Sequence, residues 1–174
     1  IKAVVERLRR EIPDICIRTT VIVGFPGETE EDFNELCEYI AQTEFDRLGA
    51  FTYSREEDTP AYDFENQIDE QTKQDRYDII MREQLHIAER KNQAFVGKRM
   101  TVLCEAYDSV AEIYYGRSAY DAPDIDTKVY FRNALGKKRI APGAFVEVDI
   151  EEAVDYDLIG RAVVCFLIFY RCPR

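Results

Sequence analysis

The chain has 174 residues, of which 46% are hydrophobic, enough for one packed domain or two small ones. Its 34 acidic and 23 basic residues give a net charge of -11, which disfavours a general nucleic-acid binder, because phosphate attracts Lys and Arg. The five cysteines show no CxxC spacing, so neither a zinc ribbon nor a disulfide scaffold is indicated, and we expect a cytoplasmic protein. No apolar run has the length to span a bilayer, and we expect no membrane partner. Because the helical pattern is already under way at the first residue, we expect the chain to be a fragment.

The chain begins with a predicted helix and a predicted strand. Residues 1–12 have helical spacing of apolar residues, with Val4, Leu8 and Ile12 on the expected buried face. Residues 15–23 then become continuously β-branched. This pattern is typical of a strand buried on both faces of a parallel sheet.

A second helix and a second strand follow a break at "GFPG". Thr29 is placed to cap the helix, with acidic residues in the first turn. The apolar spacing of the expected buried face is i, i+3, i+4, i+7, at Phe33, Leu36, Cys37 and Ile40. Residues 45–53 form the next predicted strand. The order helix, strand, helix, strand predicts an α/β layer with parallel strands.

The second half of the chain predicts a different architecture. After an acidic loop, residues 70–95 form a long polar helix that we expect to connect two domains. Its predicted buried residues are Tyr77, Ile80, Met81, Leu85 and Ala88. Short alternating strands follow, at residues 98–107, 111–120, 128–133, 144–153 and 157–166. Their spacing predicts a small five-stranded antiparallel β-barrel of the OB-like type, with a domain boundary near Phe95.

No residues of this chain predict a catalytic set. The turn "GFPGETEE", residues 24–31, lacks the glycine and lysine patterns of phosphate loops, and its glutamates would repel an anion. His86 is the only histidine and has no nucleophile near it in sequence, which favours a partly exposed helix residue. The adjacent glutamates 56–57 and 151–152 point apart and favour solvated charge.

The charge of the predicted barrel also disfavours nucleic acid. Residues 97–160 contain 8 Lys and Arg against 12 Asp and Glu, a net charge of -4. A barrel that binds RNA is expected to have the opposite sign. The stretch "GKKRI", residues 136–140, is locally basic and fits a solvated hairpin turn as well as it fits a phosphate contact.

Three stretches together resemble one enzyme family. "RTTVIVGFPGETEEDF" (18–33) and "FDRLGAFTYSREEDTPA" (45–61) resemble the last strands of the radical S-adenosylmethionine barrel of methylthiotransferases. The barrel after residue 97 is similar to the TRAM domain of that family. "GRSAYDAPDID" (116–126) is similar to the branch that modifies an aspartate of ribosomal protein S-12. The branch that modifies tRNA usually has a different sequence there.

The resemblance implies a fold and a division of the chain. Residues 1–95 are expected to form the C-terminal part of a radical-SAM α/β barrel with its connector helix. Residues 96–161 are expected to form the TRAM β-barrel, and residues 162–174 an atypical hydrophobic tail. We expect the partial α/β barrel, with an open sheet edge, to be unstable. The family commonly has glycine at the positions of Asp58 and Thr127, so the backbone of these two turns is expected to differ from that of other family members.

The resemblance also implies cofactors that this chain does not hold alone. Family members bind S-adenosylmethionine and two 4Fe-4S clusters, one through a CxxxCxxC motif that precedes the part similar to this chain. None of the five cysteines has that spacing, so we expect the fragment to be inactive by itself. In the complete enzyme, a radical from S-adenosylmethionine abstracts hydrogen from the β-carbon of the aspartate, and a methylthio group is attached.

By the same resemblance, five residues are expected to line the S-adenosylmethionine site: Arg18, Thr20, Gly24, Ala50 and Phe51. Arg18 would pair with the methionine carboxylate, and the backbone at 50–51 would hold the adenine edge. A salt bridge and core packing inside the barrel explain the same residues equally well.

We expect the barrel to dock ribosomal protein S-12 through Arg117, Asp121, Asp124 and Asp126. Ribosomal proteins are generally basic, so an acidic barrel is complementary to one and repels tRNA, which makes nucleic acid an improbable direct substrate. Two alternatives remain at the level of sequence. In the first alternative, the chain is part of a tRNA methylthiotransferase and not of the enzyme that modifies S-12. In the second, it is a stand-alone binding module associated with the ribosome.

Overall fold

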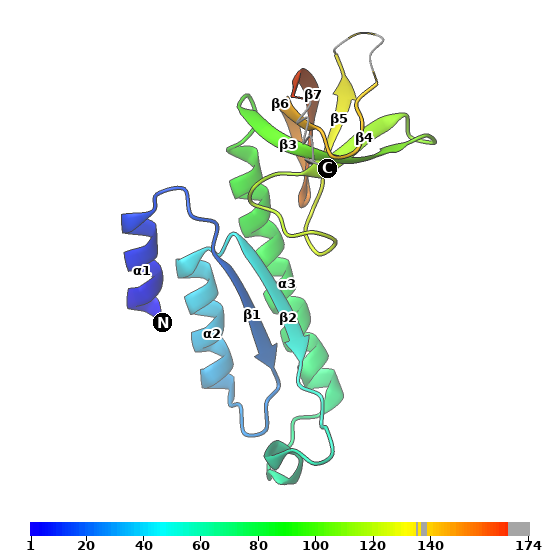
Figure 1. Cartoon of the computed structure of the whole chain (residues 1–174). Coiled ribbons are helices and arrows are strands. Elements are labelled where there is room, and N and C mark those ends of the chain that lie inside the picture. The colour runs from blue at the N-terminus through cyan, green and yellow to red at the C-terminus, as the bar shows by residue number, and fades with distance from the viewer. Residues whose placement is uncertain (135, 137–138, 167–174) are drawn as a thin grey trace, which may run out of the picture. The chain divides into compact units, whose positions relative to one another are not determined.

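The structure is a computed structural model that describes residues 1–134, 136 and 139–166. The chain forms two compact units, Ile1–Ala88 and a second that begins at Glu89 (Figure 1). Elements of the first unit are α1 (Lys2–Glu11), β1 (Arg18–Val23), α2 (Glu30–Thr43), β2 (Arg47–Thr52) and the short 3-10 helix η1 (Pro60–Asp63). Helix α3 (Glu70–Gln93) begins in the first unit and ends in the second.

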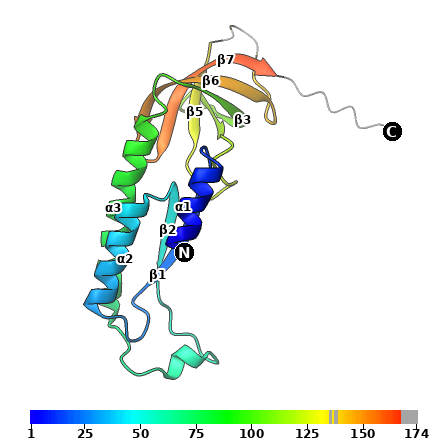
Figure 2. The ribbon, with the colours of Figure 1, turned by 90° about the vertical axis from the view of Figure 1, so that its left-hand side faces the viewer.

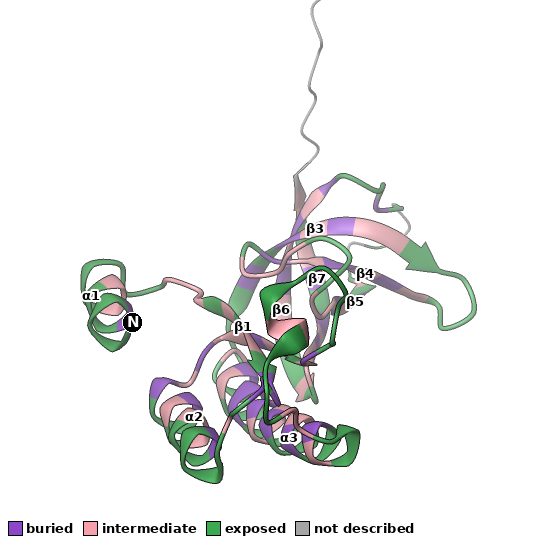
Figure 3. Cartoon of the chain, turned by 90° about the horizontal axis from the view of Figure 1, so that it is seen from below, coloured by how far each residue is buried: buried purple, intermediate pink, exposed green. Residues whose placement is uncertain are grey.

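Strands β1 and β2 form a two-stranded parallel sheet, from Arg18 opposite Arg47 to Val23 opposite Thr52. The predicted parallel arrangement is therefore confirmed. Helices α2 and α3 cover one face of this sheet (Figure 2). The core between them contains Val23, Leu48 and Ala50 from the strands, Phe33 and Ile40 from α2, and Ile80 and Ile87 from α3. Buried positions accordingly run in stripes along both helices (Figure 3).

The other face of the sheet is exposed. Successive side chains of a strand point to opposite faces, and β1 alternates until its last residue, Val23, which is fully buried. Ile22 is 57% exposed and Phe51, its partner on β2, is 63% exposed. The prediction that residues 15–23 form a strand buried on both faces is wrong for this unit. The strand begins at Arg18, and the helices α2 and α3 lie on the same side of it.

Helix α1 packs through a different face from the predicted one. Val5 is buried, whereas Val4 is 60% exposed and Ile12 is 51% exposed. Arg9, one turn after Val5, donates to the carbonyl oxygen of Glu44 at 2.8 Å. This contact with the end of α2 turns Val5 inward, because residues four apart share one face of a helix.

Helix α2 begins with the predicted capping arrangement. The Thr29 hydroxyl accepts from the Asp32 backbone N–H at 3.1 Å, and the Asp32 carboxylate accepts from the Thr29 N–H at 2.9 Å. The Asp32 carboxylate also accepts from the Thr29 hydroxyl at 2.8 Å, and the two hydrogen bonds that the backbone and side chain of Thr29 donate to this carboxylate lower the pKa of Asp32. The predicted N-cap is confirmed, and it fixes the start of α2 after the turn that follows β1.

Helix α3 has a partly polar buried side. Of the five residues predicted to be buried, Ile80 and Ala88 are buried, and Tyr77, Met81 and Leu85 are half-buried. The other buried positions of α3 are Ile87 and four polar residues, Lys73, Arg76, Gln84 and Asn92. The spacing of apolar residues therefore located the helix but not its full contact stripe, because long polar side chains fill part of that stripe.

The second unit contains five strands: β3 (Arg99–Asp108), β4 (Ile113–Arg117), β5 (Val129–Asn133), β6 (Phe145–Val154) and β7 (Asp157–Phe166). They form a closed barrel in the order β3-β4-β5-β7-β6, so the predicted five-stranded barrel is confirmed. The antiparallel prediction is wrong, because β5 and β7 are parallel, from Val129 opposite Leu158 to Asn133 opposite Ala162. A closed ring with an odd number of strands cannot alternate direction throughout, so one pair has to be parallel.

The barrel has its own apolar core. Fully buried members include Val102, Phe131, Val146, Val148 and Ala162. Strand β7 continues to Phe166, which pairs with Phe145 of β6, so residues 162–166 of the predicted tail lie in the barrel. Residues 167–174 lie outside the described residues. Within the described ranges, no helix combines the length and apolar character needed to cross a membrane.

Gly24 ends β1 with φ +74°, and a Cβ there would lie 2.3 Å from Cγ of Lys73. We expect Gly24→Ala to lower the free energy of unfolding by about 2 to 4 kcal/mol, from backbone strain and overpacking. Gly27→Ala is the matched control, because Gly27 has φ +85° but no atom within 4 Å of a Cβ. Urea unfolding of both variants measures the difference. Equal losses would show that Lys73 does not restrict this position.

Candidate functional site

The parallel strands of the first unit end at a compact turn. Gly24 donates its backbone N–H to Glu28 Oε1 at 3.0 Å. The ring of Phe25 packs edge-on against Tyr53, with centroids 5.2 Å apart, and against Phe64 at 6.1 Å. Ligands of open parallel sheets bind at the carboxyl ends of the strands, so this turn stands where a ligand is expected.

A buried arginine of α3 holds the turn. Arg76 is 5% exposed and donates to Glu28 Oε1 and to Glu30 Oε1, each at 2.6 Å. Burial opposes its charge, but the hydrogen bonds that it donates to Glu30 and Glu28, with the negative charge of these residues, outweigh that effect and raise the pKa of Arg76. Two of the three glutamates of this turn are therefore partners of a buried cation, and they fasten it to α3.

The structure brings three of the five predicted S-adenosylmethionine residues to one surface. Arg18, Thr20 and Phe51 lie on the exposed face of the sheet. The side chain of Ala50 is 6% exposed and packs in the core on the opposite face. Gly24 lies in the turn just after β1. Only the backbone of Ala50 is therefore placed to serve a ligand on the exposed face.

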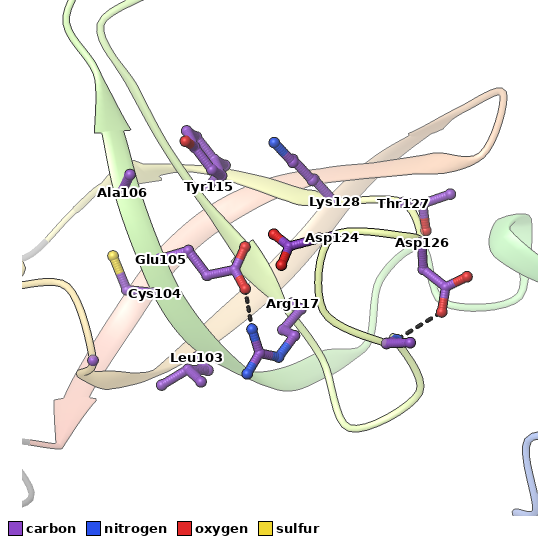
Figure 4. A pocket seen from close by; sticks show the side chains of 12 residues that line it. Leu103, Cys104, Glu105, Ala106, Tyr115, Arg117, Asp124, Asp126, Thr127 and Lys128 are labelled. Carbon is purple, nitrogen blue, oxygen red and sulfur yellow. Dashed lines mark hydrogen bonds and ion pairs between the residues drawn. The ribbon is translucent and has the colours of Figure 1, made fainter.

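The barrel has a pocket of about 500 Å³ between β3, β4 and the loop before β5 (Figure 4). Its charged and aromatic lining residues are Glu105, Tyr115, Arg117, Asp124, Asp126 and Lys128. Arg117 forms an ion pair with Glu105. The ammonium of Lys128 lies 4.2 Å from the centroid of the Tyr115 ring, in cation–π contact. Both cations of the pocket thus have a contact within the chain.

The three predicted docking aspartates have different surroundings. Asp121 accepts from the Ser118 hydroxyl at 2.6 Å and is not among the residues that line the pocket. Asp126 accepts from the backbone N–H of Ala122 at 2.6 Å, so it shapes the loop. Asp124 is exposed, with φ +62°, and its carboxylate points toward the Glu105–Arg117 pair (Figure 4).

Of the six charged and aromatic residues that line the pocket, sequence reasoning missed three: Glu105, Tyr115 and Lys128. The available signal was the alternation of the strands, which turns residues 115 and 117 outward on β4. That signal does not show which outward residues of β3 and β4 are neighbours. The register does, with Ala106 opposite Tyr115 and a bulge between 104 and 106.

The four cysteines that the structure describes do not gather into a cluster site. Cys104 is buried in the barrel core, and Cys16, Cys37 and Cys165 are half-buried. Among residues 1–134, 136 and 139–166, no group of three or more His, Cys, Asp or Glu side chains is arranged to hold a metal ion. Cys172 lies outside the described residues. The histidine prediction is confirmed, since His86 is exposed on α3.

The two turns at which the family commonly has glycine differ from each other. Asp58 has φ +63°, the left-handed region that glycine favours. Thr127 is not among the residues with positive φ, whereas Asp124 of the same loop is. The first turn therefore keeps a glycine-like backbone without glycine.

Comparisons with known proteins agree with the barrel and with the motifs. Residues 96–163 match the TRAM domain family. Curated relatives named "Ribosomal protein uS12 methylthiotransferase RimO" align with most of the chain. The relative from Acetivibrio thermocellus is 47% identical over 163 residues, which is 94% of this chain and 35% of the relative. That from Geobacter sulfurreducens is 43% identical over 94% of this chain and 36% of the relative. That from Desulforamulus reducens is 46% identical over 92% of this chain and 36% of the relative.

The second unit thus places the chain among proteins that contain a TRAM domain. By sequence, the chain belongs to the ribosomal protein uS12 methylthiotransferase family, as the motifs predicted. It spans about a third of the length of the curated relatives it matches.

The buried ion network at the turn is expected to be essential for the first unit. We expect Arg76→Met to lower the free energy of unfolding by about 3 kcal/mol, because Glu28, whose side chain is 12% exposed, loses its partner. The matched control is Arg99→Met, which breaks an exposed pair with Asp149 on the barrel and should have a much smaller effect. Denaturant unfolding measures both. Equal effects would contradict a structural role for the buried pair.

Cys104 is expected to resist alkylation in the folded chain. Burial, with smaller contributions from Cys165 and Glu105, raises the pKa of the Cys104 thiol to about 11. At pH 8 the thiolate is then roughly one part in a thousand, and the thiolate is the reactive form. Peptide mapping after iodoacetamide treatment should show slower labelling of Cys104 than of Cys16, and denaturant should remove the difference. Rapid labelling of Cys104 in the native chain would contradict its burial.

Proposed function

We propose that this chain is part of an enzyme that attaches a methylthio group to the β-carbon of an aspartate of ribosomal protein uS12. The observation that carries the proposal is the 43–47% identity of nearly the whole chain to relatives of that one name. In the proposed complete enzyme, S-adenosylmethionine and two 4Fe-4S clusters supply radical chemistry and sulfur transfer. We expect it to act in the cytoplasm, without a membrane partner.

We propose that residues 1–95 form the C-terminal part of a radical-SAM α/β barrel with its connector helix. In such a barrel, parallel strands carry helices on the outside and turn their other face to a packed interior. The two-stranded sheet has the same arrangement, because α2 and α3 cover one of its faces and the exposed Ile22 and Phe51 lie on the other. The remaining strands of the barrel would cover that exposed face.

The exposed face also suits S-adenosylmethionine. The guanidinium of Arg18 is a suitable partner for the methionine carboxylate, and Phe51, opposite Ile22, offers an aromatic surface further along the same face. Gly49, opposite Thr20, has no atom within 4 Å of the position of a Cβ, so the space above Gly49 on this face of the sheet is open. In our proposal Arg18 and Thr20 orient the ligand, and the backbone of Gly24, Ala50 and Phe51 holds its edges.

The residues of this chain do not fit the iron–sulfur clusters. The described part contains no set of metal ligands, and Cys104 is enclosed in the barrel core. We therefore propose that the cluster ligands belong to residues outside this chain. The chain alone is expected to be inactive.

The TRAM barrel is the proposed docking domain for uS12, through Arg117, Asp121, Asp124 and Asp126. Its net charge of -4 over residues 97–160 favours a basic protein and disfavours tRNA as a direct substrate. Asp124 and Arg117 lie in the pocket, and Asp121 and Asp126 support the loop beside it.

Binding of purified uS12 and of bulk tRNA to the 174-residue chain tests this proposal. We expect saturable binding of uS12 that weakens as salt rises from low to physiological concentration, and no comparable binding of tRNA. Isothermal titration at two salt concentrations provides the measurement. Binding of tRNA with a steep salt dependence, and none of uS12, would assign the chain to a tRNA-modifying enzyme instead.

A further inference from the structure

The pocket of the barrel combines the groups that recognise a guanidinium. Two carboxylates, Glu105 and Asp124, and the aromatic face of Tyr115 line it together (Figure 4). A planar guanidinium binds carboxylates through paired N–H groups and stacks on aromatic rings. The volume of about 500 Å³ exceeds what one side chain needs, so the pocket admits a side chain together with the backbone that carries it.

The chain already places its own cations on two of these groups. Arg117 pairs with Glu105, whose side chain is 26% exposed, and Lys128 lies over Tyr115. These contacts show that the Glu105 carboxylate and the Tyr115 ring, as they are oriented in the pocket, can each bind a cation. Both contacts are partly open to solvent, so an incoming cation competes with them at moderate cost.

Asp124 differs from the other carboxylates of the pocket. The described residues provide no hydrogen bond or ion pair to its side chain, whereas Asp126 accepts from the loop backbone. Its φ of +62° is a conformation that few residues other than glycine adopt. The loop thus holds Asp124 exposed, with its carboxylate directed into the pocket (Figure 4).

We propose that this pocket binds one arginine side chain of a basic protein segment, with the guanidinium between Asp124 and Glu105 and against Tyr115. The inference rests on the proposed function, because that function requires a basic protein partner. An anion is disfavoured, since three carboxylates line the pocket against two cations, and one of those cations, Arg117, is already paired. The other, Lys128, lies over the ring of Tyr115.

The test uses the whole 174-residue chain and three short peptides that differ at one position, which is arginine, lysine or citrulline. Titration followed by amide NMR shifts should give saturable changes at Tyr115 and Asp124 with the arginine peptide. We expect weaker binding of the lysine peptide and none of citrulline, which keeps the shape without the charge. Equal binding of the citrulline peptide, or shifts confined to other parts of the barrel, would overturn the inference.

Two variants separate the pocket from the general charge of the barrel. Asp124→Asn keeps the size of the side chain and should weaken the arginine peptide about fivefold or more. Glu152→Gln removes one charge from an exposed position of β6 that does not line the pocket, and should change binding less than twofold. If both variants weaken binding equally, the attraction is non-specific and the inference is wrong. Unchanged folding of each variant is checked by circular dichroism.

Binding of uS12 to the same variants distinguishes this inference from the proposed function. If uS12 binds Asp124→Asn as tightly as the original chain, docking stands and the pocket is not its arginine site. If the arginine peptide binds the pocket but uS12 does not bind the chain, the pocket stands and the docking proposal fails. Displacement of the arginine peptide by RNA would contradict a protein partner for this pocket.

Discussion

The buried guanidinium of Arg76 is the interaction on which the first unit depends most. It binds two glutamates that flank the N-cap of α2 and so joins α3 to the turn after β1. Gln84, which is further along the same buried side of α3, donates a hydrogen bond to the carbonyl oxygen of Phe45 just before β2. Polar side chains on one helix therefore set the positions of both strands, and a charge buried here without its partners would be strongly destabilising. The exposed sheet face, with Arg18 and Thr20, is held in place by contacts made on the opposite face.

Closure is the corresponding constraint in the second unit. Five strands cannot close without at least one parallel pair, and in this barrel that pair is β5 and β7. Strands β4 and β5 are antiparallel neighbours, with Gly116 opposite Val129, yet a long loop of residues 118–128 joins them and carries Asp124 and Asp126 to the pocket beside β3 and β4. The pocket therefore depends on this loop as well as on the barrel strands, and its charged lining comes from three separate segments.

The sequence predicted the order of elements well, because that order depends on local patterns. Periodicity located the α-helices and the strands but not the short 3-10 helix η1, and Thr29 was correctly predicted as the N-cap of α2, where the structure adds a capping box with Asp32. The failures concern packing. The apolar face of α1 is turned by the contact of Arg9 with the end of α2, and the stripe of α3 is completed by Lys73 and Gln84, which no apolar spacing marks.

By itself, the sequence determined the parallel strands of the first unit, the five-stranded barrel of the second, the family and the residues of the motifs, since these depend on neighbours along the chain. Only the tertiary structure decided which side chains share a surface. It separated Ala50 from Arg18 and Thr20, because alternate residues of a strand face opposite sides. It also brought Glu105 and Tyr115 beside Asp124, because strand register and loop path place together residues that are distant in sequence.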